Sequence, residues 1–290
     1  LPYIKMLATE EQKQRWLPKF VSGEEMWAIA MTEPGTGSDL AGMKTTAKLS
    51  EDGTHYVLNG AKTFITGGVH ADRVIVCART APADAENRRK GISLLVVDTK
   101  APGYAVGRKL DKLGLKTSDT AELSFTDVKV PVEDLLGEEG EGFSYLGRNL
   151  PQERLGIALG AYAQAAAAIR FTQDYVTQRM VFGQPVAAFQ NTKFELAACK
   201  AKVDAAQAVV DRGIEALDAG ELTPAEAASA KLFCTEVAAD VIDRCLQLHG
   251  GYGFMNEYPI ARLYADNRVN RIYGGTSEVM KSIISKDMGL

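Results

Sequence analysis

The chain has 290 residues, of which 46% are hydrophobic and 24% are charged, and its formal net charge is −4. This is the composition of a globular protein of one or two domains with a large core, and it provides no basic field for nucleic acid or an anionic membrane. The four cysteines form no C-x-x-C pair, so we expect buried thiols and neither a zinc site nor a disulfide scaffold. No apolar run approaches the roughly 20 residues that span a bilayer, so we expect no membrane span.

The first 140 residues change from one helical pattern to a strand pattern. Residues 10–22 predict an amphipathic helix that is interrupted near Pro18. Residues 27–133 are rich in β-branched runs separated by turn signals such as Asn59-Gly60. They predict an antiparallel β-domain, either a barrel or a sandwich, in which residues 81–90 form an exposed hairpin connection.

The rest of the chain predicts long helices. Thr223-Pro-Ala-Glu226 is a helix-start signal, and Gly220 suits the residue after a helix end. Three helices of more than seven turns indicate an antiparallel bundle, so the expected fold class is α+β. Helical spacing covers residues 142–179, 189–219, 223–249, 258–272 and 276–287.

Two segments of the β-domain could bind a ligand. In Met31–Asp39, two glycines and a proline set a tight turn whose backbone N–H groups and hydroxyls could approach a planar or phosphate-bearing ligand. It has neither P-loop spacing nor a dinucleotide-fold setting, and it equally suits a plain hairpin loop. In Asn59–Gly68, Phe64 could cover one face of a ring system and Thr66 could supply a hydroxyl, or the segment is an ordinary barrel strand.

Glu153 lies among apolar residues of the helical region, in Leu150-Pro-Gln-Glu-Arg-Leu155. A carboxylate in an apolar pocket has a raised pKa and can act as a base near neutral pH. Taken alone, the position suits a solvated glutamate on an exposed helix face better, because most glutamates are surface residues.

Three turns between helices are also candidates. Arg179 ends a helix, where it suits either phosphate recognition or the helix dipole. Gln247–Phe254 and Arg271–Glu278 are glycine turns between helices, which could simply cap those helices. Gly274–Thr276 begins the final helix, so its free N–H groups could receive a carbonyl or phosphate oxygen. His249 alone suits a structural role better than a catalytic one.

In their order and spacing, these motifs resemble the acyl-CoA dehydrogenase family from about residue 8 to residue 290. Thr32-Glu-Pro-Gly-Thr-Gly-Ser-Asp39 and Gln247-Leu-His-Gly-Gly-Tyr-Gly-Phe254 are similar to its two signature regions. The resemblance implies a remnant of an N-terminal helical domain at 1–25, a middle β-domain at 26–138 and a C-terminal four-helix bundle at 139–290. Most of the N-terminal domain is expected to be missing from this chain.

The resemblance also implies site residues. Residues bordering the substrate would be Ser38, Pro151, Gln152, Arg154, Gly274 and Gly275. Residues binding the cofactor FAD, some of them reaching the FAD of a neighbouring subunit, would be Met31, Thr32, Gly37, Ser38, Phe64, Ile65, Thr66, Arg179, Phe182, Gln190, Gln247, Leu248, Gly250, Gly251, Thr276, Ser277 and Glu278.

The position of the catalytic base departs from the commoner family pattern. Many members carry a glutamate just before the Gly-Thr of the last motif, where this chain has Gly274. A minority, including long-chain and isovaleryl enzymes, carry the base on the first long bundle helix, and Glu153 matches that position. The loss at one site and the gain at the other imply that Glu153 is the base. The strings Pro151-Gln-Glu-Arg154 and Ile272-Tyr-Gly-Gly-Thr-Ser-Glu278 resemble the long-chain members most. Tyr273 lies where isovaleryl enzymes carry a small residue, which argues against a branched substrate.

The implied reaction is α,β-dehydrogenation of an acyl-CoA to a trans-2-enoyl-CoA, with electrons passed to an electron-transferring flavoprotein. A homotetramer is expected, in the cytoplasm of a bacterium or in the mitochondrial matrix. The alternatives are an acyl-CoA oxidase, a dehydrogenase of carrier-protein thioesters, and a flavin-free helical scaffold. Reoxidation by oxygen, failure on free CoA esters, and a purified protein without flavin would respectively mark these three.

Overall fold

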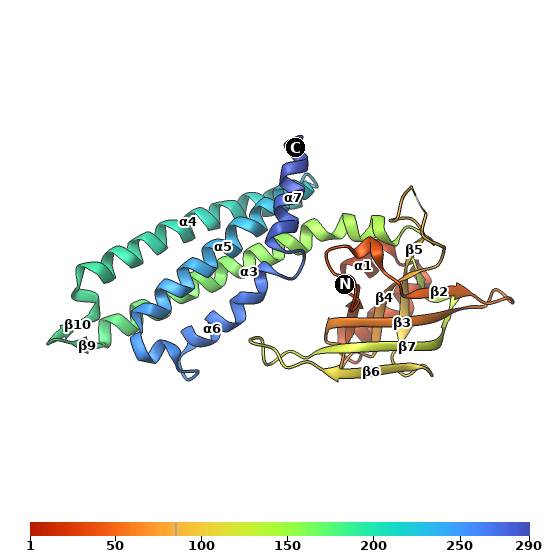
Figure 1. Cartoon of the computed structure of the whole chain (residues 1–290), viewed down its shortest axis with the longest axis horizontal. Coiled ribbons are helices and arrows are strands. Elements are labelled where there is room, and N and C mark those ends of the chain that lie inside the picture. The colour runs from red at the N-terminus through yellow and green to blue at the C-terminus, as the bar shows by residue number, and fades with distance from the viewer. Residues whose placement is uncertain (85) are drawn as a thin grey trace. The chain divides into compact units, whose positions relative to one another are not determined.

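The computed structural model describes residues 1–84 and 86–290. The chain folds into two compact units, of which the first comprises residues 1–112 and 116–149 and the second residues 113–115 and 150–290. Figure 1 shows the large sheet within the first unit and the long helices within the second. This confirms the α+β class. The division expected at residues 25 and 138 stays a prediction.

The first unit is built on an eight-stranded sheet with the order β6-β7-β3-β2-β4-β5-β8, in which β1 is joined through β4. Its strands are β1 (Trp27–Ala30), β2 (Thr46–Leu49), β3 (His55–Thr66), β4 (Arg73–Arg79), β5 (Ile92–Asp98), β6 (Tyr104–Lys109), β7 (Thr120–Pro131) and β8 (Leu135–Leu136).

The sheet is mixed, which corrects the purely antiparallel expectation. β1 runs parallel to β4, with Trp27 opposite Arg73, and Thr46 at the start of β2 also pairs with β4 in the parallel sense. The chain reaches β4 only after β2 and β3, so it can return beside β1 in the same direction. The connection 81–90 joins the antiparallel strands β4 and β5 and is largely exposed, but residue 85 lies outside the described part of the chain.

The middle of this sheet is buried on both faces. Side chains alternate along β4, so Val74 and Val76 join the core on one face while Ile75 and Cys77 join the core on the other. Trp16 of the preceding helical segment closes the second core and is only 1% exposed. Burial on both faces explains why β4 and β5 are near-continuous apolar runs.

Two helices precede the sheet, namely α1 (Pro2–Leu7) and α2 (Glu10–Ser22). α2 begins with a capping box between Thr9 and Gln12, and it runs through Pro18 without the expected interruption. Tertiary contacts outweigh the lost backbone hydrogen bond, because the Gln12 amide also donates to two main-chain carbonyls near the end of the sheet, at 2.9 and 2.8 Å.

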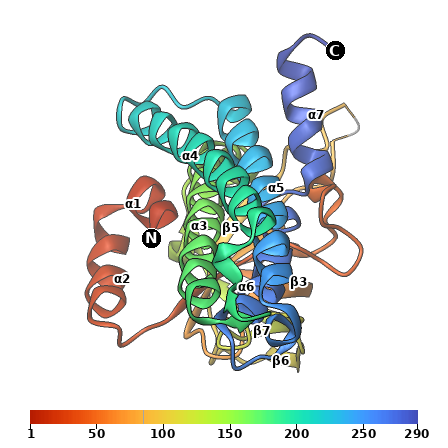
Figure 2. The same ribbon diagram turned by 90° about the vertical axis from the view of Figure 1, so that its left-hand side faces the viewer.

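Three long helices dominate the second unit and run alongside one another (Figures 1 and 2). Their shared core is rich in alanine, which allows close packing. The capping box of Thr223 and Glu226 is confirmed, and Gly220 follows the preceding helix with a φ of 73°. The helices are α3 (Gly142–Gln178), α4 (Gln190–Asp218), α5 (Pro224–Leu248), α6 (Pro259–Asn267) and α7 (Ser277–Asp287), and a hairpin of β9 (Met180–Val181) and β10 (Gln184–Pro185) joins α3 to α4.

The helix expected over 258–272 is shorter than predicted. α6 ends at Asn267 and continues as a 3₁₀ turn to Arg271. Asn270 is buried, and its amide donates to the side chains of Asn267 and Gln164, which fixes the tighter turn. The four cysteines are buried free thiols, as predicted. None of the described helices is long and apolar enough to cross a membrane.

Candidate functional site

The Met31–Asp39 loop of the first unit is held by a buried ion pair. Glu33 and Lys62 are 3.0 Å apart, and the Lys62 amine also donates to the Met31 carbonyl. Glu33 further accepts the backbone N–H groups of Lys44 and Thr45. Burial opposes ionisation of Glu33, but these hydrogen bonds and the Lys62 charge outweigh it, so the pKa of Glu33 is lowered. The loop is therefore rigid at its base, while Gly37 and Ser38 are exposed.

We expect Glu33→Gln to destabilise the first unit by about 3 kcal/mol, because it leaves Lys62 buried without its carboxylate. The lowered pKa means that ionised Glu33 stabilises the fold above pH 4.5, its ordinary pKa, and that this contribution is lost as the pH falls through the folded-state pKa. The stability gap between parent and variant should therefore narrow in acid. Urea unfolding at several pH values measures it. Asp39→Asn, which breaks an exposed pair with Arg88, should cost less than about 1 kcal/mol, and an equal loss in both variants would contradict the assignment.

Phe64 is turned outward by an irregularity in β3. The register of β3 against β7 shifts between Lys62 and Ile65, and Phe64 there has a φ of 60° and is 67% exposed. Such a backbone is strained for an aromatic residue and is typical of functional sites. Thr66 is also exposed, whereas the Ile65 side chain lies in the core, so only its backbone could meet a ligand.

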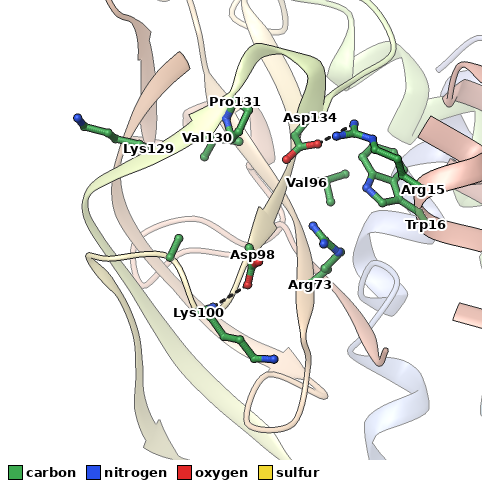
Figure 3. A pocket seen from close by; sticks show the side chains of 11 residues that line it. Arg15, Trp16, Arg73, Val96, Asp98, Lys100, Lys129, Val130, Pro131 and Asp134 are labelled. Carbon is green, nitrogen blue, oxygen red and sulfur yellow. Dashed lines mark hydrogen bonds and ion pairs between the residues drawn. The ribbon is translucent and has the colours of Figure 1, made fainter. Parts of the chain in front are cut away.

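A cavity of about 390 Å³ lies between α2 and the sheet of the first unit. Figure 3 shows Arg15 directed at Asp134, and these groups are 2.9 Å apart. Arg73, which also lines the cavity, is 2.9 Å from Glu25. Both guanidinium groups thus have carboxylate partners, and none of the predicted site residues lines this cavity.

The turn before α7 is held by two buried cations. Gly274 and Gly275 have φ values of 64° and 98°, in the left-handed region that favours glycine. Arg154 of α3 donates from Nε to the Gly274 carbonyl at 3.2 Å, and Lys231 of α5 donates from Nζ to the Gly275 carbonyl at 2.7 Å. Arg154 is 7% exposed and Lys231 is 1% exposed. Two helices therefore fix both peptides of this turn.

Glu153 lies on the face of α3 that meets this turn. Ile157 follows it by one helical turn on the same face. A Cβ built on Gly274 would lie 2.5 Å from Cδ1 of Ile157, so this face of α3 is in direct contact with the glycine turn. Glu153 is half-buried, while its predicted neighbours Pro151 and Gln152 are buried and exposed, respectively. The predicted base, Arg154 and the glycine turn thus belong to one region.

The first turn of α7 completes this region. Thr276 is its N-cap and accepts the N–H of Val279, while Glu278 is exposed. Ser277 is buried, and its hydroxyl donates to Glu236 of α5 at 2.9 Å. Free N–H groups at the start of α7 could meet an anionic or carbonyl oxygen, as the sequence suggested.

A cavity of about 430 Å³ lies where α3 ends and α5 gives way to its glycine turn. Its lining includes Arg179, Leu248, Gly250 and Gly251, which are four of the predicted cofactor residues. A Cβ built on either glycine would meet nothing within 4 Å, so ligand atoms can approach this backbone closely. The guanidinium of Arg179 lies 5.5 Å from the ring of Tyr252, also in the lining. This donor set suits an anionic, partly aromatic ligand.

His249 stabilises the glycine turn that follows α5. It is 4% exposed, its ring stacks on Tyr175 at 4.4 Å, and its Nδ1–H donates to the Cys245 carbonyl. Burial lowers the pKa of His249, so it is neutral near pH 7. The Tyr175 hydroxyl donates to the His249 carbonyl. These contacts agree with the structural role expected for this histidine.

Among the predicted cofactor residues that do not line this cavity, three lie at the ends of α4 and α5 and in the β9–β10 hairpin. Gln190 and Gln247 are exposed at the start of α4 and near the end of α5. Phe182 is 96% exposed at the tip of the β9–β10 hairpin, with a φ of 51°. An exposed phenyl group in a strained turn is available to a second molecule, but these residues stay predictions.

Residues 140–289 match the family model described as the C-terminal domain of acyl-CoA dehydrogenase, and residues 28–128 match the model of its middle domain. The chain belongs to the acyl-CoA dehydrogenase family.

It is 46% identical to the mitochondrial long-chain specific acyl-CoA dehydrogenase of Sus scrofa over 99% of this chain and 66% of that protein. It therefore spans slightly less than two thirds of that relative. The crystal structure of an acyl-CoA dehydrogenase from Geobacillus kaustophilus has 51% identity and a TM-score of 0.96, and the match covers 100% of this chain and 75% of that one. An acyl-CoA dehydrogenase from Bacillus anthracis, solved with FAD, has 36% identity and a TM-score of 0.92 over 99% of this chain and 51% of that one.

Proposed function

We propose that the complete protein carries out FAD-dependent α,β-dehydrogenation of an acyl-CoA thioester to a trans-2-enoyl-CoA, with Glu153 as the base. The observation that carries this proposal is the position of Glu153 on the face of α3 that contacts the Gly274 turn. The commoner anchor for the base, next to the Gly-Thr of the last motif, carries no side chain here because residue 274 is glycine.

The chemistry begins with a weakly acidic C–H group beside the thioester carbonyl. Glu153 takes that proton, and negative charge develops on the carbonyl oxygen. The N–H of Gly274 would donate to this oxygen, and a donor fixed in advance lowers the barrier without reorganising during the reaction. Arg154 holds the Gly274 carbonyl and so orients that glycine. FAD, when bound, accepts the hydride that leaves the β-carbon.

The residues present suit FAD. The cavity beside Arg179 offers a guanidinium and open glycine backbone, which suit a phosphate-bearing part of a dinucleotide, and its roughly 430 Å³ is enough for part of that cofactor. In the first unit, the exposed Phe64 and Thr66 provide an aromatic face and a hydroxyl for a ring system. The similar Bacillus anthracis structure is a complex with FAD.

We further propose a long, unbranched acyl chain as substrate and an electron-transferring flavoprotein as electron acceptor. The Pro151-Gln-Glu-Arg154 and Ile272-Tyr-Gly-Gly-Thr276 strings support the first, together with the identity to a long-chain specific enzyme. Residues such as Phe182, exposed at a hairpin tip, support an FAD site shared between subunits of a homotetramer.

An anaerobic titration of the full-length protein tests the reaction. The purified protein should show a flavin spectrum that bleaches with palmitoyl-CoA and recovers when an electron-transferring flavoprotein is added. Rapid recovery with oxygen instead would indicate an oxidase. A flavin that bleaches only with shorter, branched or carrier-bound thioesters would overturn the substrate class, and a protein that binds no flavin would overturn the proposal as a whole.

A further inference from the structure

Lys231 is a buried charge that holds the turn before α7 but has no part in the proposed reaction so far. It lies in an alanine-rich stretch of α5 and is 1% exposed. Burial, and then the nearby charge of Arg154, lower the pKa of Lys231 to about 8. Two like charges facing the same turn oppose each other and lose hydration, so the pair is costly as a purely structural device.

What Lys231 contacts is specific. Its Nζ donates to the Gly275 carbonyl at 2.7 Å, while Arg154 holds the Gly274 carbonyl from the opposite helix. The Lys231 stem also lines the turn, since a Cβ on Gly274 would lie 3.6 Å from its Cε. The two carbonyls belong to the consecutive peptides on either side of Gly275, so the cations together fix the backbone angles of Gly275 and hold the carbonyl side of Gly274.

We propose that Lys231 is a positioning residue for the reaction. With Arg154 it clamps the Gly274–Gly275 turn, so that the Gly274 N–H points at the thioester oxygen and positive charge lies near the oxygen as it becomes negative. This inference rests on the proposed dehydrogenation and assigns a role to a side chain outside the substrate contacts.

Two properties follow from this geometry. The clamp acts on the orientation of the turn and on the charge around it, so it should affect the formation of the enolate more than the binding of the acyl-CoA. It should also depend on a positive charge at position 231 and not on lysine itself, because the group bonds to a carbonyl oxygen.

The test compares Lys231→Met, Lys231→Arg and the control Lys200→Met in the full-length flavoprotein. Lys200 is an exposed lysine of α4 paired with Asp204, so its loss removes the same charge away from the turn. For Lys231→Met we expect kcat with palmitoyl-CoA to fall about 10- to 100-fold, less than for direct removal of an oxyanion donor. KM should change little, and Lys231→Arg should recover most of the activity.

A substrate analogue measures separately how much the charge of Lys231 stabilises the enolate. A 3-thia-acyl-CoA can lose its α-proton but no hydride, and its enolate beside the flavin gives a long-wavelength absorbance. In Lys231→Met the pKa of the bound analogue should rise by about 1 unit, equivalent to a tenfold weaker stabilisation of the enolate. An unchanged analogue pKa together with an unchanged kcat would overturn the proposal.

Amide hydrogen exchange measures how firmly the Gly274–Gly275 turn is held, independently of catalysis. Exchange in residues 273–276 should be about tenfold faster in Lys231→Met than in the parent and the control, as expected for loss of one charge-assisted hydrogen bond. If the parent is not reduced by any acyl-CoA, the proposed function fails, yet this measurement still decides the clamp. Unchanged exchange would refute it. If Lys231→Met does not fold, Lys231→Gln takes its place, because glutamine keeps a hydrogen-bond donor without the charge. Parent-like exchange and a parent-like kcat in Lys231→Gln would refute the role of the charge.

Discussion

Replacing Glu153 by glutamine should lower the rate of flavin reduction by palmitoyl-CoA about 10³-fold in the full-length protein, within the range known for a general base. Glutamine keeps the shape of the side chain but cannot accept the α-proton. Substrate binding should change little, because the contacts of Arg154 and Lys231 with the glycine turn remain. Anaerobic stopped-flow absorbance measures the reduction rate, and quenching of the flavin by substrate measures binding.

Asp174→Asn is the matched control for this experiment. Asp174 is an exposed carboxylate on the same helix, more than five turns further along α3, so its loss tests for a general effect of charge on the helix. The control should reduce flavin at the parent rate. If Glu153→Gln also does so, Glu153 has no role as the base and the α-proton is taken by another group.

Local signals explain what the sequence could predict. Thr223, Pro224 and Glu226 form a helix start within a few residues, and Gly220 ends a helix through its own backbone freedom. Such features need no knowledge of the rest of the fold. The placement of Glu153 on a long helix could likewise be predicted, because it depends on local periodicity, whereas its role as the base stays a prediction.

The features that the sequence did not reveal depend on distant partners. Glu33 and Lys62 are 29 residues apart, and Lys231 is 44 residues from Gly275. Each charge alone resembles a surface residue, and only the fold shows that both partners are buried. A lone lysine directly after the small residues Ala227–Ala230 of α5 is the one available signal, since an amphipathic helix seldom places a charge on its apolar face. The parallel pairing of β1 with β4 was missed for the same reason.

A glutamate placed at residue 274 should not be able to replace Glu153 in this chain. In the Glu153→Gln background, we expect Gly274→Glu to restore no activity, although many family members carry their glutamate there. A Cβ at residue 274 would lie 2.5 Å from Cδ1 of Ile157, and the φ of 64° is strained for any side chain. The new carboxylate would therefore displace the turn, and its strain should cost about 1–3 kcal/mol of stability.

Adding Ile157→Ala to that double variant removes the methyl group that blocks the Cβ. The triple variant should then reduce flavin at least tenfold faster than Glu153→Gln alone, because a base near the α-carbon restores part of the 10²- to 10⁴-fold contribution of general base catalysis. Ile157→Ala in the Glu153→Gln background is the control and should gain nothing. Activity in the double variant, which still has Ile157, would show that the Ile157 side chain does not determine the position at which a catalytic base is tolerated. If instead only the triple variant recovers, residues 157 and 274, which are far apart in the sequence, are coupled by one methyl contact. In this chain the choice of anchor for the base would then be set by how closely α3 packs against the glycine turn, and not by the glutamate alone.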